Sequence, residues 1–276
     1  LKKALQLYSV REDMKKDFDA TVKAVGKMGY EGVELVFDSR DFANFCGKSA
    51  EQMAAVCQEA GVVPVSAHIE FNELVRDAAG YAEYCKKIGC IQGVIPYLDH
   101  SLLPGGPSYQ QTAENIRKIS AAFKEQGLFL AYHNPDFEFD RVGDAYVLDA
   151  LYSDLDESVL QTQLDTCWVN VGGENPAEYV LKYAGRCPTV HIKDFAGAKG
   201  DKAPYALIGK EGGQSESGSF EFRTVGGGVQ NIPALVAASE KAGADWIIVE
   251  QDAPSGGHSA MTCAKMSIDY LNEITK

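Results

Sequence analysis

The chain has 276 residues, of which 45% are hydrophobic and 24% are charged, and this balance predicts a globular protein rather than a disordered one. Its formal net charge of −13 at pH 7 argues against nucleic acids and anionic membranes as partners, because phosphate groups are bound mainly through cationic side chains. The sequence has no apolar run of the roughly 18 residues that a membrane span needs, no signal peptide, and no CxxC pair among its seven cysteines, so we expect a cytoplasmic protein with reduced thiols.

The predicted elements follow one repeated pattern, in which an amphipathic, helix-like segment ends at a glycine and an apolar, strand-like run follows. The first example is GKMGYEGVELVF at residues 26–37. Glycine suits the left-handed backbone conformation just beyond a helix C-terminus, which gives the pattern a physical cause. The glycines of the pattern are Gly29, Gly61, Gly89, Gly127, Gly185 and Gly243.

The gap between Gly127 and Gly185 is about twice the earlier step, and LDESVLQTQLD, ending at Asp165, fills it with a strand-like run that lacks the glycine. With this run and the opening segment ALQLYSV, the pattern predicts eight strands with helices between them. In chain order the predicted strands span residues 4–10, 32–37, 62–68, 91–96, 128–133, 160–165, 187–193 and 246–250. Alternating strands and helices imply parallel pairing, and eight such units favour a closed (β/α)8 TIM barrel, here a single domain over residues 1–276. An open sheet that binds a dinucleotide is disfavoured, because no GxGxxG motif follows the first strand.

One stretch departs from the repeat. Residues 196–225 are rich in Gly, Lys and Ser, which predicts a long loop or lid and a candidate contact in a homo-oligomer. The glycine cluster GGGV at 226–229 precedes a predicted helix instead of following a strand, so a plain turn is favoured over a phosphate-binding loop.

Polar residues gather at the predicted strand ends, which form the active-site face in a barrel of this kind. They are Gln6, Tyr8, Arg11, Glu34, His68, Glu70, His133, Asn134, Glu138, Asp165, His191, Lys193, Asp194, Glu250, Gln251 and Asp252. Burying so many ionisable groups is costly unless they are paired or bind a metal. Carboxylates and imidazoles without thiolates suit one divalent cation, Mn²⁺, Mg²⁺, Co²⁺ or Zn²⁺. Taken singly, each His also fits a hydrogen-bonded core residue and each Asp a helix N-cap.

These motifs resemble the xylose isomerase-like barrel superfamily, the sugar phosphate isomerase/epimerase group. The resemblance covers nearly the whole chain and rests on GYEGVEL, AYHNPDFEF, QLDTCW, VHIKDF, TVGGGVQNIPAL and WIIVEQD. It implies one divalent metal held by an acidic residue, an Asp, a His and a Glu from strands five to eight. Asp165, His191 and Glu250 match three of these ligands, and His68 matches a histidine that the family often carries after strand three.

The fourth ligand is less direct. Where many members of the family have Glu followed by Asn, this chain has His133 followed by Asn134. We assign Glu138, just beyond, as the replacement carboxylate, and His133 as a direct ligand is the competing assignment. Trp168 stands where related sequences have a histidine, which predicts a more apolar pocket there.

The chemistry that this constellation suits is removal of a proton beside a carbonyl. A divalent metal lowers the barrier to such a step as a Lewis acid, and two carboxylates can remove and return the proton. We assign proton exchange to Glu138 and Glu250, and binding of hydroxyl groups or polarisation of the carbonyl to His68, His133 and Lys193. Alternatively, Lys193 forms an ion pair with Asp194 or with another acidic residue at the rim. Glu34 either orients His68 or pairs with Arg11, and Gln251 and Asp252 support the residues that contact the metal.

The sequence therefore predicts a metal-dependent sugar isomerase or epimerase that acts on a ketose, a keto-sugar or a cyclic polyol. A metal-dependent lyase or dehydratase, similar to inosose dehydratase or acting on a 3-keto-glycoside, is the alternative, because the same intermediate can lose a leaving group. A sugar-binding protein without catalysis is a third reading. Neutral substrates are favoured over phosphorylated ones, since the predicted rim offers only Arg11 and Lys193 as cations.

Overall fold

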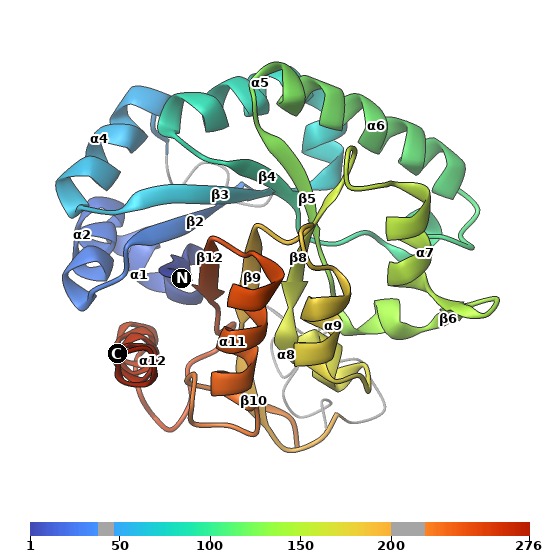
Figure 1. Ribbon diagram of the computed structural model, residues 1–276. Helices are drawn as coiled ribbons and strands as arrows, with labels where there is room; N and C mark the ends of the chain where they lie inside the picture. The colour runs from blue at the N-terminus through green and yellow to red at the C-terminus, as the bar shows by residue number, and fades with distance from the viewer. Residues whose placement is uncertain (38–46, 200–218) are drawn as a thin grey trace.

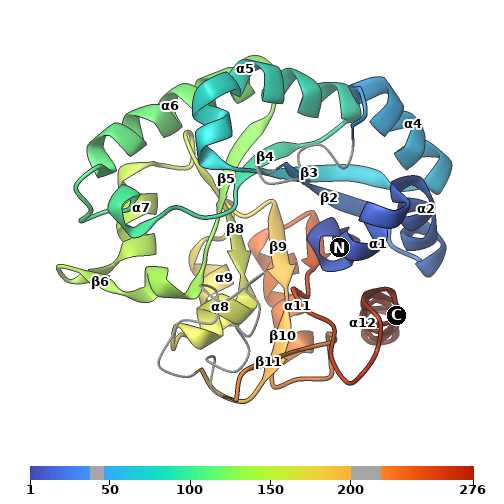
Figure 2. The same ribbon diagram turned by 180° about the vertical axis from the view of Figure 1, so that it is seen from behind.

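The computed structural model describes residues 1–37, 47–199 and 219–276 (Figure 1). Eight parallel strands close into a barrel in the order β1-β12-β9-β8-β5-β4-β3-β2, and helices surround it, as the two opposite views show (Figure 1, Figure 2). The barrel strands are β1 (Lys2–Gln6), β2 (Gly32–Phe37), β3 (Val63–Ile69), β4 (Gln92–Ile95), β5 (Phe129–His133), β8 (Gln161–Asp165), β9 (Thr189–Ile192) and β12 (Trp246–Val249). The predicted (β/α)8 barrel is therefore confirmed.

Helices connect successive strands. The α-helices are α1 (Arg11–Lys16), α2 (Phe18–Met28), α4 (Ala50–Ala60), α5 (Phe71–Ile88), α6 (Tyr109–Glu125), α7 (Val147–Asp154), α8 (Thr166–Val171), α9 (Pro176–Lys182), α11 (Ile232–Ala242) and α12 (Ala260–Ile274). Short 3₁₀ helices are η1 (Leu7–Val10), η2 (His100–Leu102) and η3 (Asp136–Phe139). Within the three described ranges, none of the helices combines the length and apolar character needed to cross a membrane.

Four of the six pattern glycines cap helices as predicted, Gly127 follows the C-cap of α6, and Gly185 lies beyond the end of α9. All six have positive φ angles, between 69° and 106°. Gly29, Gly61, Gly89 and Gly243 are the left-handed C-caps of α2, α4, α5 and α11. Residues with a Cβ rarely adopt this backbone conformation, so these positions favour glycine. The glycines thus determine where each helix ends before the next strand.

Most predicted strand ends lie within two residues of those in the structure, and two predictions differ by more. The first strand ends at Gln6 rather than at residue 10, because the Gln6 side chain accepts a hydrogen bond from the backbone N–H of Tyr8 and starts η1. Within the predicted loop at 196–225, β10 (Asp194–Ala196) pairs in antiparallel fashion with β11 (Glu221–Arg223), which lies beside it in Figure 2. The rest of that loop, residues 200–218, lies outside the described residues.

The barrel interior carries a layer of polar side chains below its carboxyl-terminal end. They are Gln6, Glu34, Ser66, Gln92, Gln163 and Thr189, and each is 0% exposed. Strand register places Glu34 level with Gln6 on one side and with Ser66 on the other. Barrel interiors of this fold are usually filled by branched apolar residues, so a buried polar layer next to the active-site face indicates a functional demand there.

Candidate metal centre

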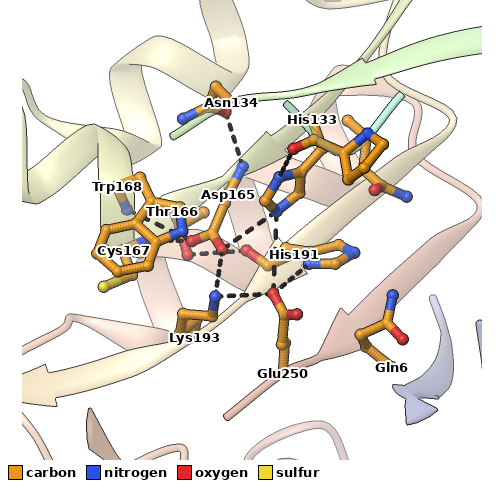
Figure 3. Close-up of polar contacts among 12 residues, drawn as sticks. Gln6, His133, Asn134, Asp165, Thr166, Cys167, Trp168, His191, Lys193 and Glu250 are labelled. Atoms are coloured by element: carbon orange, nitrogen blue, oxygen red, sulfur yellow. Dashed lines mark hydrogen bonds and ion pairs between the residues drawn. The ribbon is translucent and has the colours of Figure 1, made fainter. Parts of the chain in front are cut away.

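Four ionisable side chains meet where the barrel strands end (Figure 3). His133 ends β5, Asp165 ends β8, His191 lies in β9, and Glu250 follows β12 directly. One nitrogen or oxygen atom from each lies within 4.8 Å of the others, and all four residues are buried. Strand register contributes to this arrangement, since Asp165 pairs with His191 across β8 and β9.

The separations between these atoms suit a single cation. His133 Nε2 lies 3.4 Å from Asp165 Oδ2 and 3.9 Å from Glu250 Oε2. His191 Nδ1 lies 3.1 Å from the same Glu250 oxygen. Bonds of about 2.1 Å to one first-row cation would place neighbouring ligand atoms about 3.0–3.4 Å apart, so only small adjustments separate this arrangement from a coordination shell.

The hydrogen bonds of the two imidazoles also fit metal binding. His133 Nδ1 donates to the carbonyl oxygen of Pro96 at 3.0 Å, so its Nε2 carries the lone pair that faces the group. His191 Nε2 donates to Glu34 Oε1 at 2.7 Å, which leaves Nδ1 toward Glu250. His133 Nε2 is buried, yet it has no hydrogen-bond partner among the described residues. A metal-binding histidine normally fixes its other ring N–H in this way, on a carbonyl or a carboxylate.

Asp165 serves two purposes. Its Oδ1 accepts hydrogen bonds from the backbone N–H groups of Cys167 and Trp168 and so caps α8, as the helix-cap interpretation predicted. Its Oδ2 faces His133 and the Lys193 ammonium instead. The backbone N–H of Asp165 donates to the Asn134 side chain at 2.9 Å. One carboxylate thus anchors the helix while its second oxygen remains directed into the site.

Lys193 lies among the carboxylates of the site, with a side chain that is only 1% exposed. Its ammonium is 3.1 Å from Asp165 Oδ2, 2.7 Å from Glu250 Oε2 and 2.9 Å from Asp252 Oδ2. It also lies over the buried Trp168 ring, 4.8 Å from its centre. Burial alone would raise the pKa values of Asp165 and Glu250, but the Lys193 charge holds both below their usual range.

Asp194 is not the partner of Lys193. Its carboxylate accepts four backbone hydrogen bonds, from the N–H groups of Phe195, Gly226, Gly228 and Gln230, at 2.9–3.1 Å. Three of these donors belong to the TVGGGVQN segment. The glycine cluster is therefore a structured turn closed by a carboxylate of the same chain, and its amide groups are already occupied.

Glu34 is the centre of the buried polar layer and does not pair with Arg11, which donates to the carbonyl oxygens of Tyr8 and Asp252. Four side chains donate to the Glu34 carboxylate. They are Gln6 Nε2 (2.7 Å), Ser66 Oγ (2.5 Å), Gln163 Nε2 (2.6 Å) and His191 Nε2 (2.7 Å). Although Glu34, His68 and His191 also lie close enough to hold an ion, the oxygens of Glu34 are used by these donors, which makes a second metal centre there unfavourable.

His68 extends this network. Its Nε2 lies 2.7 Å from Gln163 Oε1 and 3.2 Å from Glu34 Oε1, and its ring stacks on that of His191 with centres 5.4 Å apart. The sequence analysis did not single out Gln163. Its position could have been found by alternation, since Gln163 precedes Asp165 by two residues and therefore shares its inward face.

The structure does not bring Glu138 into the ligand group. After His133 the chain continues through Pro135 into η3, and the Glu138 carboxylate accepts a hydrogen bond from the Tyr132 hydroxyl. Tyr132 precedes the inward-facing His133 and so faces the helix layer. Burial raises the pKa of Glu138 well above its usual value. The position that the sequence analysis gave to Glu138 is occupied by His133 instead.

The fold and the site together define the class of protein: a TIM barrel with two imidazoles and two carboxylates converging at its catalytic face. A family model for the xylose isomerase-like TIM barrel matches residues 22–274, and the chain belongs to that family.

Curated relatives of this chain include proteins named inosose dehydratase. The protein from Geobacillus kaustophilus is 22% identical over 283 residues, covering 93% of this chain and 87% of the relative. The protein from Clostridium beijerinckii is 25% identical over 168 residues, covering 59% of this chain and 53% of the relative. The chain thus spans about half the length of this second relative.

Solved structures share the fold along the whole chain. A sugar phosphate isomerase/epimerase from Parabacteroides distasonis superposes with a TM-score of 0.76 at 19% identity, covering 100% of this chain and 96% of the other. The IolI protein, solved with a bound zinc atom, superposes with a TM-score of 0.68 at 16% identity, covering 99% of this chain and 98% of the other.

Proposed function

We propose that this protein is a divalent-metal-dependent enzyme that removes a proton beside the carbonyl of a sugar or a cyclic polyol. His133, Asp165, His191 and Glu250 would hold the cation, which supplies Lewis-acid polarisation of a carbonyl. The observation that carries the proposal is the orientation of the two imidazoles. Each has one ring nitrogen fixed, on Pro96 or on Glu34, so that the other ring nitrogen faces a carboxylate oxygen of the four-residue group.

The proton-handling groups of the site are unlike each other. The pKa of Glu250 is held well below its usual value, so Glu250 is an ionised acceptor, and the Lys193 ammonium is a donor 2.7 Å away. His68 adds a third group beside the ligands. Glu138, the second carboxylate of the predicted pair, is not among them. Symmetric proton exchange between two carboxylates therefore has less support than a reaction with one base and a different acid.

This asymmetry favours dehydration of a cyclic keto-polyol as the finer assignment, because elimination of water needs a base for the proton and an acid for the leaving hydroxyl. The names of the Geobacillus and Clostridium relatives point the same way. Isomerisation or epimerisation of a keto-sugar is the second candidate, supported by the name of the Parabacteroides structure. Both reactions begin with the same proton removal.

We propose a substrate without phosphate groups. Among the described residues, the two cations at the site have internal partners: Lys193 pairs with three carboxylates, and Arg11 donates to two carbonyl oxygens while stacking on Tyr8. Releasing either cation to bind a phosphate would leave buried acceptors unpaired, which is costly.

Product analysis in deuterated water tests the proposal. The protein, loaded with Mn²⁺, Co²⁺ or Zn²⁺, is incubated with ketoses, inososes and 3-keto-glycosides. Loss of water with an unsaturated product supports dehydration, and solvent deuterium in a retained carbon skeleton supports isomerisation. Chelation and the double variant Asp165→Ala/Glu250→Ala should each abolish turnover. Turnover that survives both would contradict a metal-dependent enzyme.

A further inference from the structure

A lysine shares the oxygen atoms that the candidate metal centre needs. The ammonium of Lys193 contacts Asp165 Oδ2 and Glu250 Oε2, and these same two oxygens face His133 Nε2 and, for Glu250, also His191 Nδ1. A divalent cation bound there and the ammonium would therefore compete for the same negative charge. Like charges at such short range repel strongly in a buried site, where water screens them little.

Lys193 cannot avoid this competition by turning into solvent. Its side chain is 1% exposed, and its ammonium lies over the rings of Trp168 and Phe222, at 4.8 and 5.7 Å from their centres. It does have one partner outside the ligand group, since Asp252 Oδ2 lies 2.9 Å away. Asp252 is itself buried, and it contributes no atom to the four-residue group.

We propose that Lys193 is the internal counter-cation of this centre and limits its affinity for metal. This inference rests on the metal site of the proposed function. Without metal, the ammonium neutralises Asp165 and Glu250 and holds them together. When a cation takes these oxygens, Asp252 retains the ammonium. Lys193 and Asp252 thus act as a pair. Lys193 opposes metal binding, and Asp252 allows metal to bind by holding the buried ammonium.

Metal titrations against a competing chelator, with Mn²⁺ and with Zn²⁺, test the pair. Lys193→Met should bind metal at least about tenfold more tightly than the wild-type protein, because a buried like charge is removed. Asp252→Asn should bind metal more weakly than the wild-type protein. The effect of Asp252→Asn should be smaller when it is combined with Lys193→Met, because Asp252 acts through Lys193. Lys182→Met is the matched control. Lys182 pairs with Asp149 on the surface, and its removal should leave metal affinity unchanged.

The outcomes separate this inference from the proposed function. If the wild-type protein binds metal and Lys193→Met binds it equally or more weakly, the inference fails while the metal-dependent function stands. If neither protein binds metal, the proposed function fails and the inference fails with it. If Lys193→Met does not fold, a crystal structure of the metal-bound wild-type protein decides. The distance from Lys193 Nζ to Glu250 Oε2 should increase beyond 2.7 Å while the contact with Asp252 persists, and an unchanged arrangement would overturn the inference.

Discussion

The imidazole of His133 decides the character of the candidate ligand set. With His191 it gives two nitrogen donors beside the oxygens of Asp165 and Glu250. Imidazole nitrogen favours first-row transition ions, whereas Mg²⁺ prefers oxygen ligands and water. We therefore expect the site to select Zn²⁺, Co²⁺ or Mn²⁺ over Mg²⁺.

Substitution of His133 tests this set against the alternative ligand Glu138. His133→Ala should weaken Zn²⁺ binding at least about tenfold. Removing a residue that only orients a metal ligand already lowers metal affinity by about this factor, and removing a ligand should cost no less. Glu138→Gln should leave Zn²⁺ affinity unchanged, since the Glu138 carboxylate is bonded to Tyr132 and lies outside the group. Calorimetric titration of both variants measures the difference. The reverse order of effects would restore Glu138 as the ligand.

Glu138 should instead affect how stability depends on pH. Burial raises its pKa in the folded protein well above 4.5, so the folded state holds the proton more tightly than the unfolded chain. Its stabilising contribution is then fully present below pH 4.5 and is lost as the pH rises through the folded pKa. Glu138→Gln removes this dependence while keeping the size of the side chain. In urea unfolding with a chelator present, the free energy of unfolding of the wild-type protein should fall relative to that of the variant as the pH rises. A pH-independent difference would contradict this assignment.

Alternation along the strands explains which site residues the sequence could locate. Asp165, His191 and Glu250 lie at or next to strand ends, where position alone predicts that their side chains converge. His133 ends β5 and is located by the same rule, but the rule gives no position for Glu138. Periodicity ends with β5, and the direction of the chain beyond it is set by Pro135 and the following 3₁₀ turn.

At the scale of elements, Glu34 ties the barrel strands together below the site. Its carboxylate receives hydrogen bonds from side chains on β1, β3, β8 and β9. Burial by itself would raise its pKa, but the charges of His68 and His191 and their hydrogen bonds hold the pKa well below the usual value. The Glu34 carboxylate is thus ionised and accepts hydrogen bonds from several buried donors.

Glu34→Gln should lower the free energy of unfolding by about 2–4 kcal/mol. An amide has a single acceptor oxygen and adds two donors, so at least one buried donor of the network loses its partner. Urea unfolding measures the change. Glu31→Gln is the control, because Glu31 is exposed and accepts a hydrogen bond only near the surface, from the backbone of Lys3. Equal stability of the two variants would show that the network tolerates a neutral centre.

The elements themselves were largely predictable, and the exceptions have local causes. Six of the eight predicted strands follow a glycine of the repeated pattern, and each of these glycines has a conformation that other residues rarely adopt. The early end of β1 depends on a single hydrogen bond, which the backbone N–H of Tyr8 donates to the Gln6 side chain, and no periodicity in the sequence indicates this bond. The β10–β11 hairpin has strands of only three residues, too short for an alternating pattern to appear.

At the scale of the whole molecule, a bound cation would link four strands that lie far apart in the sequence. Binding to the native state alone stabilises it by about 2.7 kcal/mol at a free metal concentration of 100 times Kd. For a domain of this size that corresponds to roughly 5–10 °C in Tm. We expect a chelator to lower the Tm of the wild-type protein by this amount and the Tm of His133→Ala by less, because weaker binding leaves less stabilisation to remove. Differential scanning calorimetry with and without Zn²⁺ makes the comparison, and identical transitions for the wild-type protein would argue against a native-state metal site.

The carboxylate of Asp194 occupies a backbone cradle that other proteins offer to anions. A methyl group on Gly228 would lie only 2.2 Å from an Asp194 oxygen, so the cradle closes tightly around the group it already holds. A phosphoester arriving at this end of the barrel would find the cradle already filled by an internal ligand. Under the proposed function, discrimination against charged sugars would then be built into the main chain, and accepting them would require vacating that cradle before any pocket residue is redesigned.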